Sequence, residues 1–136
     1  MVKFRKFITS SGKLVLAGKS AENNEQLVAQ TQADEIVLHT AKPGSPFVNI
    51  KENSKKVTKK DIKEAAVFCA RYSHDWRDNK RDVAVHFFKG KDVYKRKGMK
   101  LGTFGVRKFK EIVVKKKDIE KFIKEKIKKE KWITSS

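Results

Sequence analysis

The sequence contains one cysteine, two prolines and no long apolar run. The single cysteine, Cys69, excludes a disulfide framework and leaves too few thiols for a cysteine-based zinc site; its helical apolar surroundings predict a core residue. Residues 1–10 lack the apolar segment of a signal peptide, and a membrane-spanning helix would need about 20 consecutive apolar residues. These absences predict a cytoplasmic protein.

Acidic residues are scarce relative to basic ones. The 136 residues include 34 lysines and arginines but only 16 aspartates and glutamates, so the formal net charge is +18. Residues 89–117 alone hold 12 basic and 2 acidic residues, a net +10. Because such an imbalance is self-repulsive unless an anion neutralises it, the charge favours nucleic acid as the partner, ahead of an anionic membrane surface.

The apolar pattern predicts a single α+β domain built on a mainly antiparallel sheet. Its clearest element is a central helix over 57–73, where Thr58 and Asp61 have the spacing of a capping box and apolar residues recur at helical intervals. A short N-terminal helix is expected after Ser20, which is a good N-cap residue. Strands are expected over 3–8, 13–18, 35–39, 47–50, 82–88, 92–96 and 103–114.

The segment 115–136 is expected to extend a domain of residues 1–114 as a basic amphipathic helix. Such a helix, with Trp132 near its end, is of a kind that can lie on a membrane surface. Its four acidic residues argue against that reading, so docking on the domain's own core is preferred. The apolar stripe for this docking consists of Ile119, Phe122, Ile123 and Ile127.

The residue types offer little for catalysis. None of His39, His74 and His86 stands at metal-binding spacing, and no phosphate-binding loop or nucleophile-elbow motif occurs, so no metal and no cofactor are expected. A nuclease-like hydrolase that uses His39 and Ser45, with Asp34, stays open as the alternative to a non-catalytic protein. His39 also has a structural reading, as a strand-end ring that bonds a backbone carbonyl.

The loop Lys42-Pro43-Gly44-Ser45-Pro46 joins two predicted strands and has two readings. Pro43 and Gly44 are common turn residues. As a phosphate site, Gly44 would expose an unhindered backbone N–H, Ser45 would add a hydroxyl donor and Lys42 would add positive charge. The residues leave both readings open.

Aromatic residues are interleaved with the basic residues of 89–117. Proteins that bind single-stranded nucleic acid combine cations that follow the backbone with rings on which bases stack. Tyr94 is the ring that we most expect at the surface. The cations expected to follow the strand are Lys95, Arg96, Lys97, Arg107 and Lys108.

Four stretches stand out in order along residues 4–114: GKSAENNEQLV, DEIVLHTAKPGSPFVNI, EAAVFCARYSHDW and VYKRKGMKLGTFGVRKFKEIVV. In order and spacing they resemble the motifs of the NFACT-R domain, the RNA-binding part of NFACT proteins. The resemblance implies a stand-alone NFACT-R protein that binds RNA, either tRNA or rRNA, in ribosome-associated quality control or translation. The large ribosomal subunit is then an expected partner, and a membrane is not.

The resemblance also implies which residues form the RNA-binding surface. Pro46 stands where many relatives have a second histidine, so that imidazole is absent here. The other domains of full NFACT proteins are absent from the sequence, so their peptide-tailing activity is not carried over, and we expect a non-catalytic protein. The implied residues are Lys19, Asn24, His39, Gly44, Ser45, Lys95, Lys97, Arg107 and Lys108, to which the residue-based reading adds Lys42, Tyr94 and Arg96.

Overall fold

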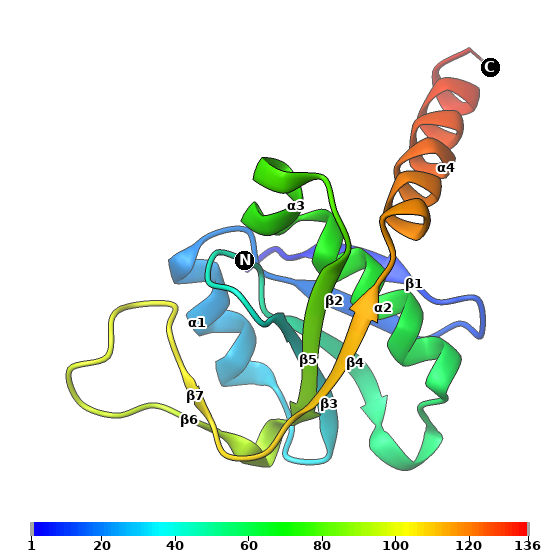
Figure 1. Cartoon of the computed structure of the whole chain (residues 1–136). Coiled ribbons are helices and arrows are strands. Elements are labelled where there is room, and N and C mark those ends of the chain that lie inside the picture. The colour runs from blue at the N-terminus through cyan, green and yellow to red at the C-terminus, as the bar shows by residue number, and fades with distance from the viewer. Residues whose placement is uncertain (1, 136) are drawn as a thin grey trace.

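A computed structural model describes the backbone of residues 2–135 and the side chains of residues 2–129. Within this range the centre is a six-stranded antiparallel sheet in the order β1-β2-β4-β3-β5-β8 (Figure 1). The predicted α+β class and mainly antiparallel sheet are confirmed. The strands are β1 (Arg5–Ile8), β2 (Leu14–Ala17), β3 (Glu35–Thr40), β4 (Val48–Asn53), β5 (Val83–Lys89) and β8 (Lys110–Val114).

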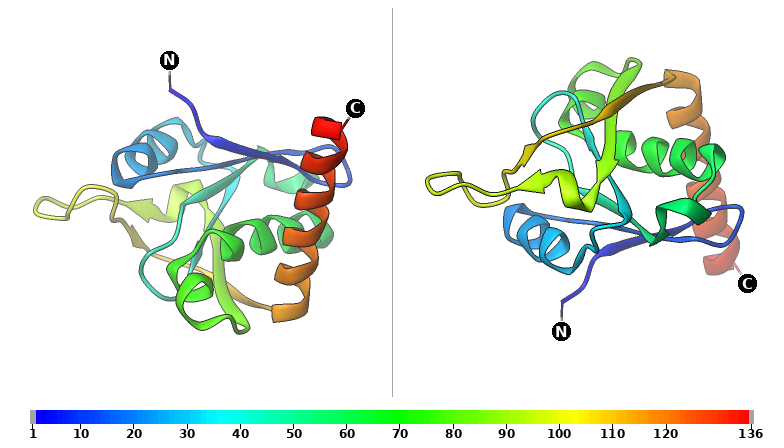
Figure 2. Two further views of the ribbon diagram at one scale, coloured as in Figure 1. Left: turned by 90° about the horizontal axis from the view of Figure 1, so that it is seen from above. Right: turned by 90° about the horizontal axis from the view of Figure 1, so that it is seen from below.

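Helices cover both sides of this sheet, and a small two-stranded ribbon projects from it. Figure 2 shows α1 and the ribbon on one side of the sheet and α2 and α4 on the other. The ribbon pairs β6 (Val93–Tyr94) with β7 (Gly105–Val106); residues 93–106 are called the β6–β7 ribbon below. The helices in residues 2–135 are α1 (Ala21–Gln30), α2 (Lys59–Arg71), α3 (His74–Asn79) and α4 (Lys116–Ser135), with the 3-10 turns η1 (Ser54–Lys56) and η2 (Gly90–Asp92).

Alternation along the strands divides the apolar side chains between two cores. Val83 and Val85 of β5 are fully buried on the side of α2, whereas Phe88 is buried on the opposite side, in one cluster with Leu27 of α1. Helix α1 packs over β2 and therefore covers only part of that second face. The remaining part of the face, over β3 and β5, is left open as a groove.

The central helix begins at the predicted capping box. The Thr58 side chain accepts a hydrogen bond from the backbone N–H of Asp61, and the Asp61 carboxylate accepts from the backbone of Thr58 and the hydroxyl of Ser11. Burial by itself would raise the pKa of Asp61, but these hydrogen bonds lower it to about 2. The carboxylate therefore fastens the β1–β2 turn to the start of α2.

Helix α3 was not predicted from the sequence. It begins after Ser73, whose hydroxyl accepts from the backbone N–H of Trp76, and the Trp76 side chain is buried in the main core. With six residues, α3 is too short for its apolar residues to show a helical period. It matters for the site because its first residue, His74, lies against the loop between β3 and β4.

The basic region and the C-terminal helix also differ in detail from the prediction. The expected strand 92–96 is reduced to the two residues of β6, and 103–114 is divided into β7 and β8. In α4, Ile119 is fully buried and Phe122 and Ile123 pack against the core, but Ile127 is 47% exposed. The predicted apolar stripe of α4 therefore packs on the domain only through its first half. Trp132 lies outside the described side chains.

Candidate nucleic-acid interface

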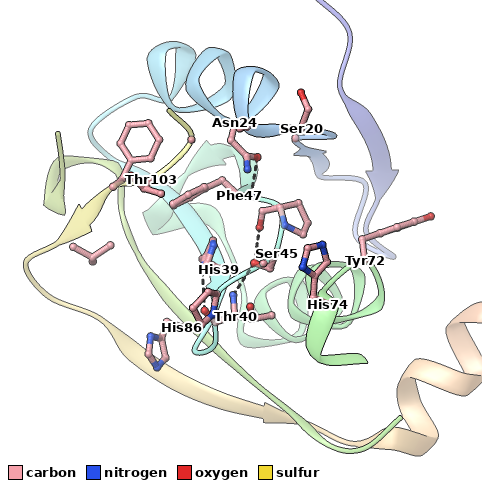
Figure 3. Close-up of a pocket in the computed structure, with 18 of the residues that line it drawn as sticks. Ser20, Asn24, His39, Thr40, Ser45, Phe47, Tyr72, His74, His86 and Thr103 are labelled. Carbon is pink, nitrogen blue, oxygen red and sulfur yellow. Dashed lines mark hydrogen bonds between the residues drawn. The ribbon is translucent and has the colours of Figure 1, made fainter. Parts of the chain in front are cut away.

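An open groove of about 780 Å³ lies on the partly covered face of the sheet. Its floor is made by β3 and β5, and its walls by the start of α1, the 41–47 loop and the β6–β7 ribbon (Figure 3). Among the side chains that the structure describes, no carboxylate lines this groove. Its rings are His39, Phe47, Tyr72, His74, His86, Phe88, Phe104 and Phe109.

The floor of the groove is a row of side chains on neighbouring strands. His39 of β3 is the direct cross-strand partner of His86 in β5, so both imidazoles lie on the same face. The Phe109 ring stacks on His86, with 4.1 Å between centroids and 19° between planes, and the Phe109 side chain is 54% exposed. An aromatic face is therefore presented to the groove and supported by a second ring.

The protonation state of His39 follows from its contacts. Its Nδ1 lies 2.7 Å from the carbonyl oxygen of Thr40, which can only accept, so Nδ1 carries the hydrogen. Burial lowers the pKa of His39, and the Thr40 carbonyl only partly offsets this effect. The ring is therefore neutral at pH 7, and its Nε2 is available as an acceptor. This contact with a backbone carbonyl is the one expected from the structural reading of His39.

The loop 42–46, called the Gly-Ser corner here, is held against α3. Gly44 has φ +85°, and its carbonyl accepts from the backbone N–H of His74 at 2.7 Å. A Cβ at Gly44 would lie 2.4 Å from Nδ1 and 3.0 Å from Cβ of His74. Both the backbone conformation and the close approach of His74 therefore require glycine at this position.

The Ser45 hydroxyl is used inside the corner. It donates to the carbonyl of Pro46 at 3.0 Å and accepts from the backbone N–H of Thr40 at 3.1 Å. The thiol of Cys69 lies beneath it, 3.8 Å from the Pro46 carbonyl, and burial raises the pKa of Cys69 to about 12. These contacts make the corner a rigid turn, and they make Cys69 the buried core residue that was predicted.

The arrangement needed by the hydrolase alternative is not formed. The His39 ring bonds Thr40 and the Ser45 hydroxyl bonds Pro46, so the two side chains do not activate each other. Asp34 precedes β3, and His39 lies five residues further along the strand, which places them about 16 Å apart at 3.3 Å per residue. The structure therefore does not bring these residues together as a Ser–His–Asp group.

The start of α1 forms another wall of the groove. The Asn24 side chain is buried, and its carbonyl oxygen accepts from the backbone N–H of Phe47 at 3.1 Å, which ties α1 to the entry of β4. Ser20 caps the helix as predicted, by accepting from the backbone N–H of Asn23. Lys19 is exposed beside this cap and lines the groove.

A single ion pair docks the β6–β7 ribbon on α1. The Lys95 ammonium donates to the Glu25 carboxylate at 2.8 Å and to the carbonyls of Lys100 and Thr103 at 2.6 and 2.7 Å. The same carboxylate oxygen accepts from the backbone N–H of Gly102 at 2.6 Å. All three donors of Lys95 therefore have protein partners, which makes it a positioning residue for the ribbon.

The Tyr94 ring is also engaged within the ribbon. It packs so closely on Gly105 that a Cβ there would lie 2.0 Å from the ring. The guanidinium groups of Arg96 and Arg107 lie 4.8 and 5.1 Å from its centroid. Tyr94 therefore organises two exposed arginines instead of presenting a bare ring to solvent.

The predicted site residues fall into two groups. Lys19, Asn24, His39, Gly44 and Ser45, which are far apart in the sequence, come together in the lining of the groove. Lys42 is exposed on the adjoining corner, and Lys97 and Lys108 are exposed on the side of the ribbon. The predicted residues outside the lining are Lys42, Tyr94, Lys95, Arg96, Lys97, Arg107 and Lys108.

Several lining residues were missed by reasoning from the sequence. His86 shares a strand face with Phe88, and that alternation could have placed it opposite the main core. Phe109 precedes β8 and carried no signal that separated it from core phenylalanines. Arg5 and Tyr72 belong to β1 and the end of α2, so only the folded structure brings them to the groove.

The family model for the NFACT protein RNA-binding domain matches residues 3–108 of the chain. This chain belongs to that family. The match includes the whole groove except Phe109, and with it the start of α1, the Gly-Ser corner and the β6–β7 ribbon. The resemblance inferred from the four motifs is confirmed.

Two relatives of this NFACT-R chain illustrate the similarity. The archaeal Rqc2 homolog aRqcH of Methanocaldococcus jannaschii is 31% identical over 107 residues, covering 75% of this chain and 16% of that protein. The chain therefore spans only a small part of the curated relative that it matches. The C-terminal part of the fibronectin/fibrinogen-binding protein of Streptococcus suis has the same fold, with a TM-score of 0.75 at 23% identity over 83% of this chain and 45% of that one.

Two further features bear on function in the part of the chain that the structure describes. None of its helices is long and apolar enough to cross a membrane. No grouping of three or more histidine, cysteine, aspartate or glutamate side chains there is arranged to hold a metal ion.

Replacing Glu25 by alanine is expected to release the β6–β7 ribbon of this NFACT-R domain from α1. The hydrogen bond from Lys95 lowers the pKa of Glu25, so the contact is intact at neutral pH and is lost as pH falls through that lowered value. Amide hydrogen exchange should accelerate at Gly102 and its neighbours while α2 stays protected. The matched control is Glu22→Ala on the exposed first turn of α1; equal protection in both variants would contradict this role.

Proposed function

We propose that this NFACT-R protein binds unpaired RNA in the groove, with bases stacked on its rings and phosphates held by basic side chains around it. The observation that supports this most strongly is the exposed Phe109 ring, supported by His86 in a groove without carboxylates. Base–aromatic stacking contributes about 1–3 kcal/mol per base and tolerates any base. A carboxylate-free lining avoids repulsion of the phosphate backbone.

The basic side chains that would hold phosphates surround the groove on several sides. Lys19 lines it at the start of α1, and Lys42 is exposed on the corner. On the ribbon side, the guanidinium groups beside Tyr94 offer planar donors suited to phosphate oxygens. Lys95 supports this surface by holding the ribbon in place. The proposed phosphate contacts are Lys19, Lys42, Arg96, Lys97, Arg107 and Lys108.

In this proposal the Gly-Ser corner does not bind a phosphate directly. The Ser45 hydroxyl donates its hydrogen to the Pro46 carbonyl. Gly44 is needed because the His74 side chain lies too close for any larger residue. Both residues therefore shape the wall, as Asn24 does by holding Phe47. Neutral His39 contributes an acceptor, Nε2, which suits a base N–H or a ribose 2′-hydroxyl.

The cellular context that we propose is extended from one relative. The name of the archaeal relative identifies it as an Rqc2 homolog, and we extend to this chain a role in ribosome-associated quality control or translation. The RNA would then be tRNA or rRNA, contacted in the cytoplasm on the large ribosomal subunit. We propose no reaction for this chain, because Nδ1 of His39 and the hydroxyl of Ser45 are each bonded to a backbone carbonyl and not to each other.

The test is the affinity for fluorescently labelled single-stranded RNA at a series of salt concentrations. Each neutralised phosphate should contribute about −0.7 to the slope of log K against log salt, so the six proposed contacts give a slope near −4. Absence of binding, or an affinity that does not respond to salt, would overturn the proposal.

The triple variant Lys19→Gln, Lys97→Gln and Lys108→Gln should weaken binding to all RNA sequences by a similar factor and reduce the salt slope by about 2. The reason is that phosphate contacts position a nucleic acid without reading its sequence. The matched control removes three exposed charges near the opposite end of the fold, with Lys55, Lys56 and Lys59 replaced by glutamine. A loss confined to one RNA sequence would show that these lysines read bases.

A further inference from the structure

Three positive side chains converge on the Tyr72 ring. The Arg5 guanidinium carbon lies 3.8 Å from the ring centroid, the Arg71 guanidinium carbon 4.9 Å and the Lys126 ammonium 5.2 Å. Lys126 also donates to the Tyr72 hydroxyl. These residues come from β1, the end of α2 and the middle of α4, so the fold assembles the cluster from three separate elements; it is called the Tyr72 cluster below.

Among the side chains that the structure describes, the Tyr72 cluster has no carboxylate partner. None of the salt bridges among the described side chains includes Arg5, Arg71 or Lys126. Moreover, the Nε of Arg71 is buried and has no hydrogen-bond partner. Buried donors are almost always paired, and like charges normally spread apart on a surface. The buried Nε is closed to solvent, so a ligand would meet only the rest of the half-buried Arg71 side chain. A group of three cations around one ring is the arrangement that an anionic ligand completes.

The Tyr72 cluster is continuous with the groove. Arg5 and Tyr72 both line it. Figure 3 shows Tyr72 beside His74, across the Gly-Ser corner from the Thr103 end of the β6–β7 ribbon. A strand whose bases stack on Phe109 and Phe104 would therefore reach the cluster at the other end of the same groove.

We propose that Arg5, Arg71 and Lys126 together form a phosphate site in addition to the contacts named above, and that it holds a backbone phosphate of the RNA strand that occupies the groove. The proposal rests on the proposed function and extends it in one respect. Lys126 lies outside the family match of residues 3–108, so α4 contributes to RNA binding in this chain. Planar guanidinium groups suit the oxygens of a phosphate, and the Lys126 ammonium adds a point charge.

The site is tested with the variant Arg5→Gln, Arg71→Gln and Lys126→Gln in the full chain. Loss of one phosphate contact should make the salt slope less negative by about 0.7, and the loss of charge-assisted hydrogen bonds should weaken RNA binding by at least about tenfold. The control is again the Lys55, Lys56 and Lys59 triple variant, which removes the same charge from η1 and the first residue of α2. Equal affinities and slopes for the two variants would overturn the proposal.

Stability measurements separate this role from a structural one. Cations near the end of α2 would also stabilise the helix, so a purely structural Arg71 would lower the melting temperature when replaced and leave RNA affinity unchanged. The phosphate site predicts weaker RNA binding by Arg71→Gln at temperatures well below the melting temperature of the variant, and unchanged affinity there would contradict it. Lys126→Gln alone, at an exposed position on α4, gives the same test without disturbing the core.

The outcomes also separate this inference from the proposed function. If the unaltered protein fails to bind single-stranded RNA, the proposed function fails. If it binds RNA and the Tyr72 cluster variant binds equally well, only the phosphate site at the Tyr72 cluster is wrong. Vesicles of phosphatidylserine and phosphatidylcholine form the second arm, and cluster-dependent binding to these vesicles in place of RNA would reassign the site to lipid headgroups.

Discussion

Gly44→Ala is expected to destabilise the protein by about 2–4 kcal/mol and to reduce RNA affinity more than any single lysine substitution. Part of the cost is the left-handed backbone conformation, at φ +85°. The rest comes from the new methyl group, which would overlap the His74 ring and also lie 3.0 Å from its Cβ. Because that Cβ is fixed by the hydrogen bond from the His74 backbone to Gly44, rotation of the ring alone does not relieve the overlap.

Two other glycines provide matched controls for Gly44. Gly12 and Gly98 have φ +90° and +91°, but a Cβ at either position would meet nothing within 4 Å. Each alanine substitution should therefore lower the free energy of unfolding by about 1–2 kcal/mol, which is the cost of the left-handed backbone conformation alone. Chemical denaturation measures all three variants, and Gly44→Ala combined with His74→Ala should recover part of the loss. Equal costs at the three glycines would show that the contact with His74 is unimportant.

Phe109→Ala is expected to weaken binding of single-stranded RNA by about 1–3 kcal/mol, the usual contribution of one stacked base. The slope of log K against log salt should stay unchanged, because no charge is removed. Folding stability should change little, since the side chain is 54% exposed. Fluorescence anisotropy at two salt concentrations measures both quantities.

The control for Phe109 is Val113→Ala in β8, which removes another exposed apolar side chain that does not line the groove. It should leave RNA affinity unchanged. If both variants bind RNA as tightly as the unaltered protein, bases do not stack on the Phe109 ring, and the basic side chains around the groove alone would account for binding.

The elements that could be predicted from the sequence are those specified by local chemistry. The capping box at Thr58 and Asp61 starts α2 where expected, and the alternation along β5 assigns Val83 and Val85 to the main core. Helix α3 escaped prediction because its stability comes from burial of Trp76. The division of 92–114 into short strands likewise depends on a tertiary contact, the bond of Lys95 to a carboxylate 70 residues away.

The candidate site could likewise be predicted only in part from the sequence. The motifs identified the start of α1 and the Gly-Ser corner as parts of one surface, and residues of both line the groove. Reasoning from residue types could not show that the Ser45 hydroxyl donates to a backbone carbonyl. It also could not show that the Lys95 ammonium donates to a carboxylate and to backbone carbonyls. Nor could it show that Arg5 and Lys126 meet over Tyr72, because they belong to opposite ends of the chain.

The most direct test of RNA binding in the groove is an NMR titration of the full chain with single-stranded RNA. The account predicts that the largest changes occur in the ring signals of His39, His86 and Phe109 and in the amide signals of the 41–47 loop, with saturation at one strand per protein. Changes confined to the lysines of η1 and the exposed face of α4, with the groove signals unmoved, would contradict it.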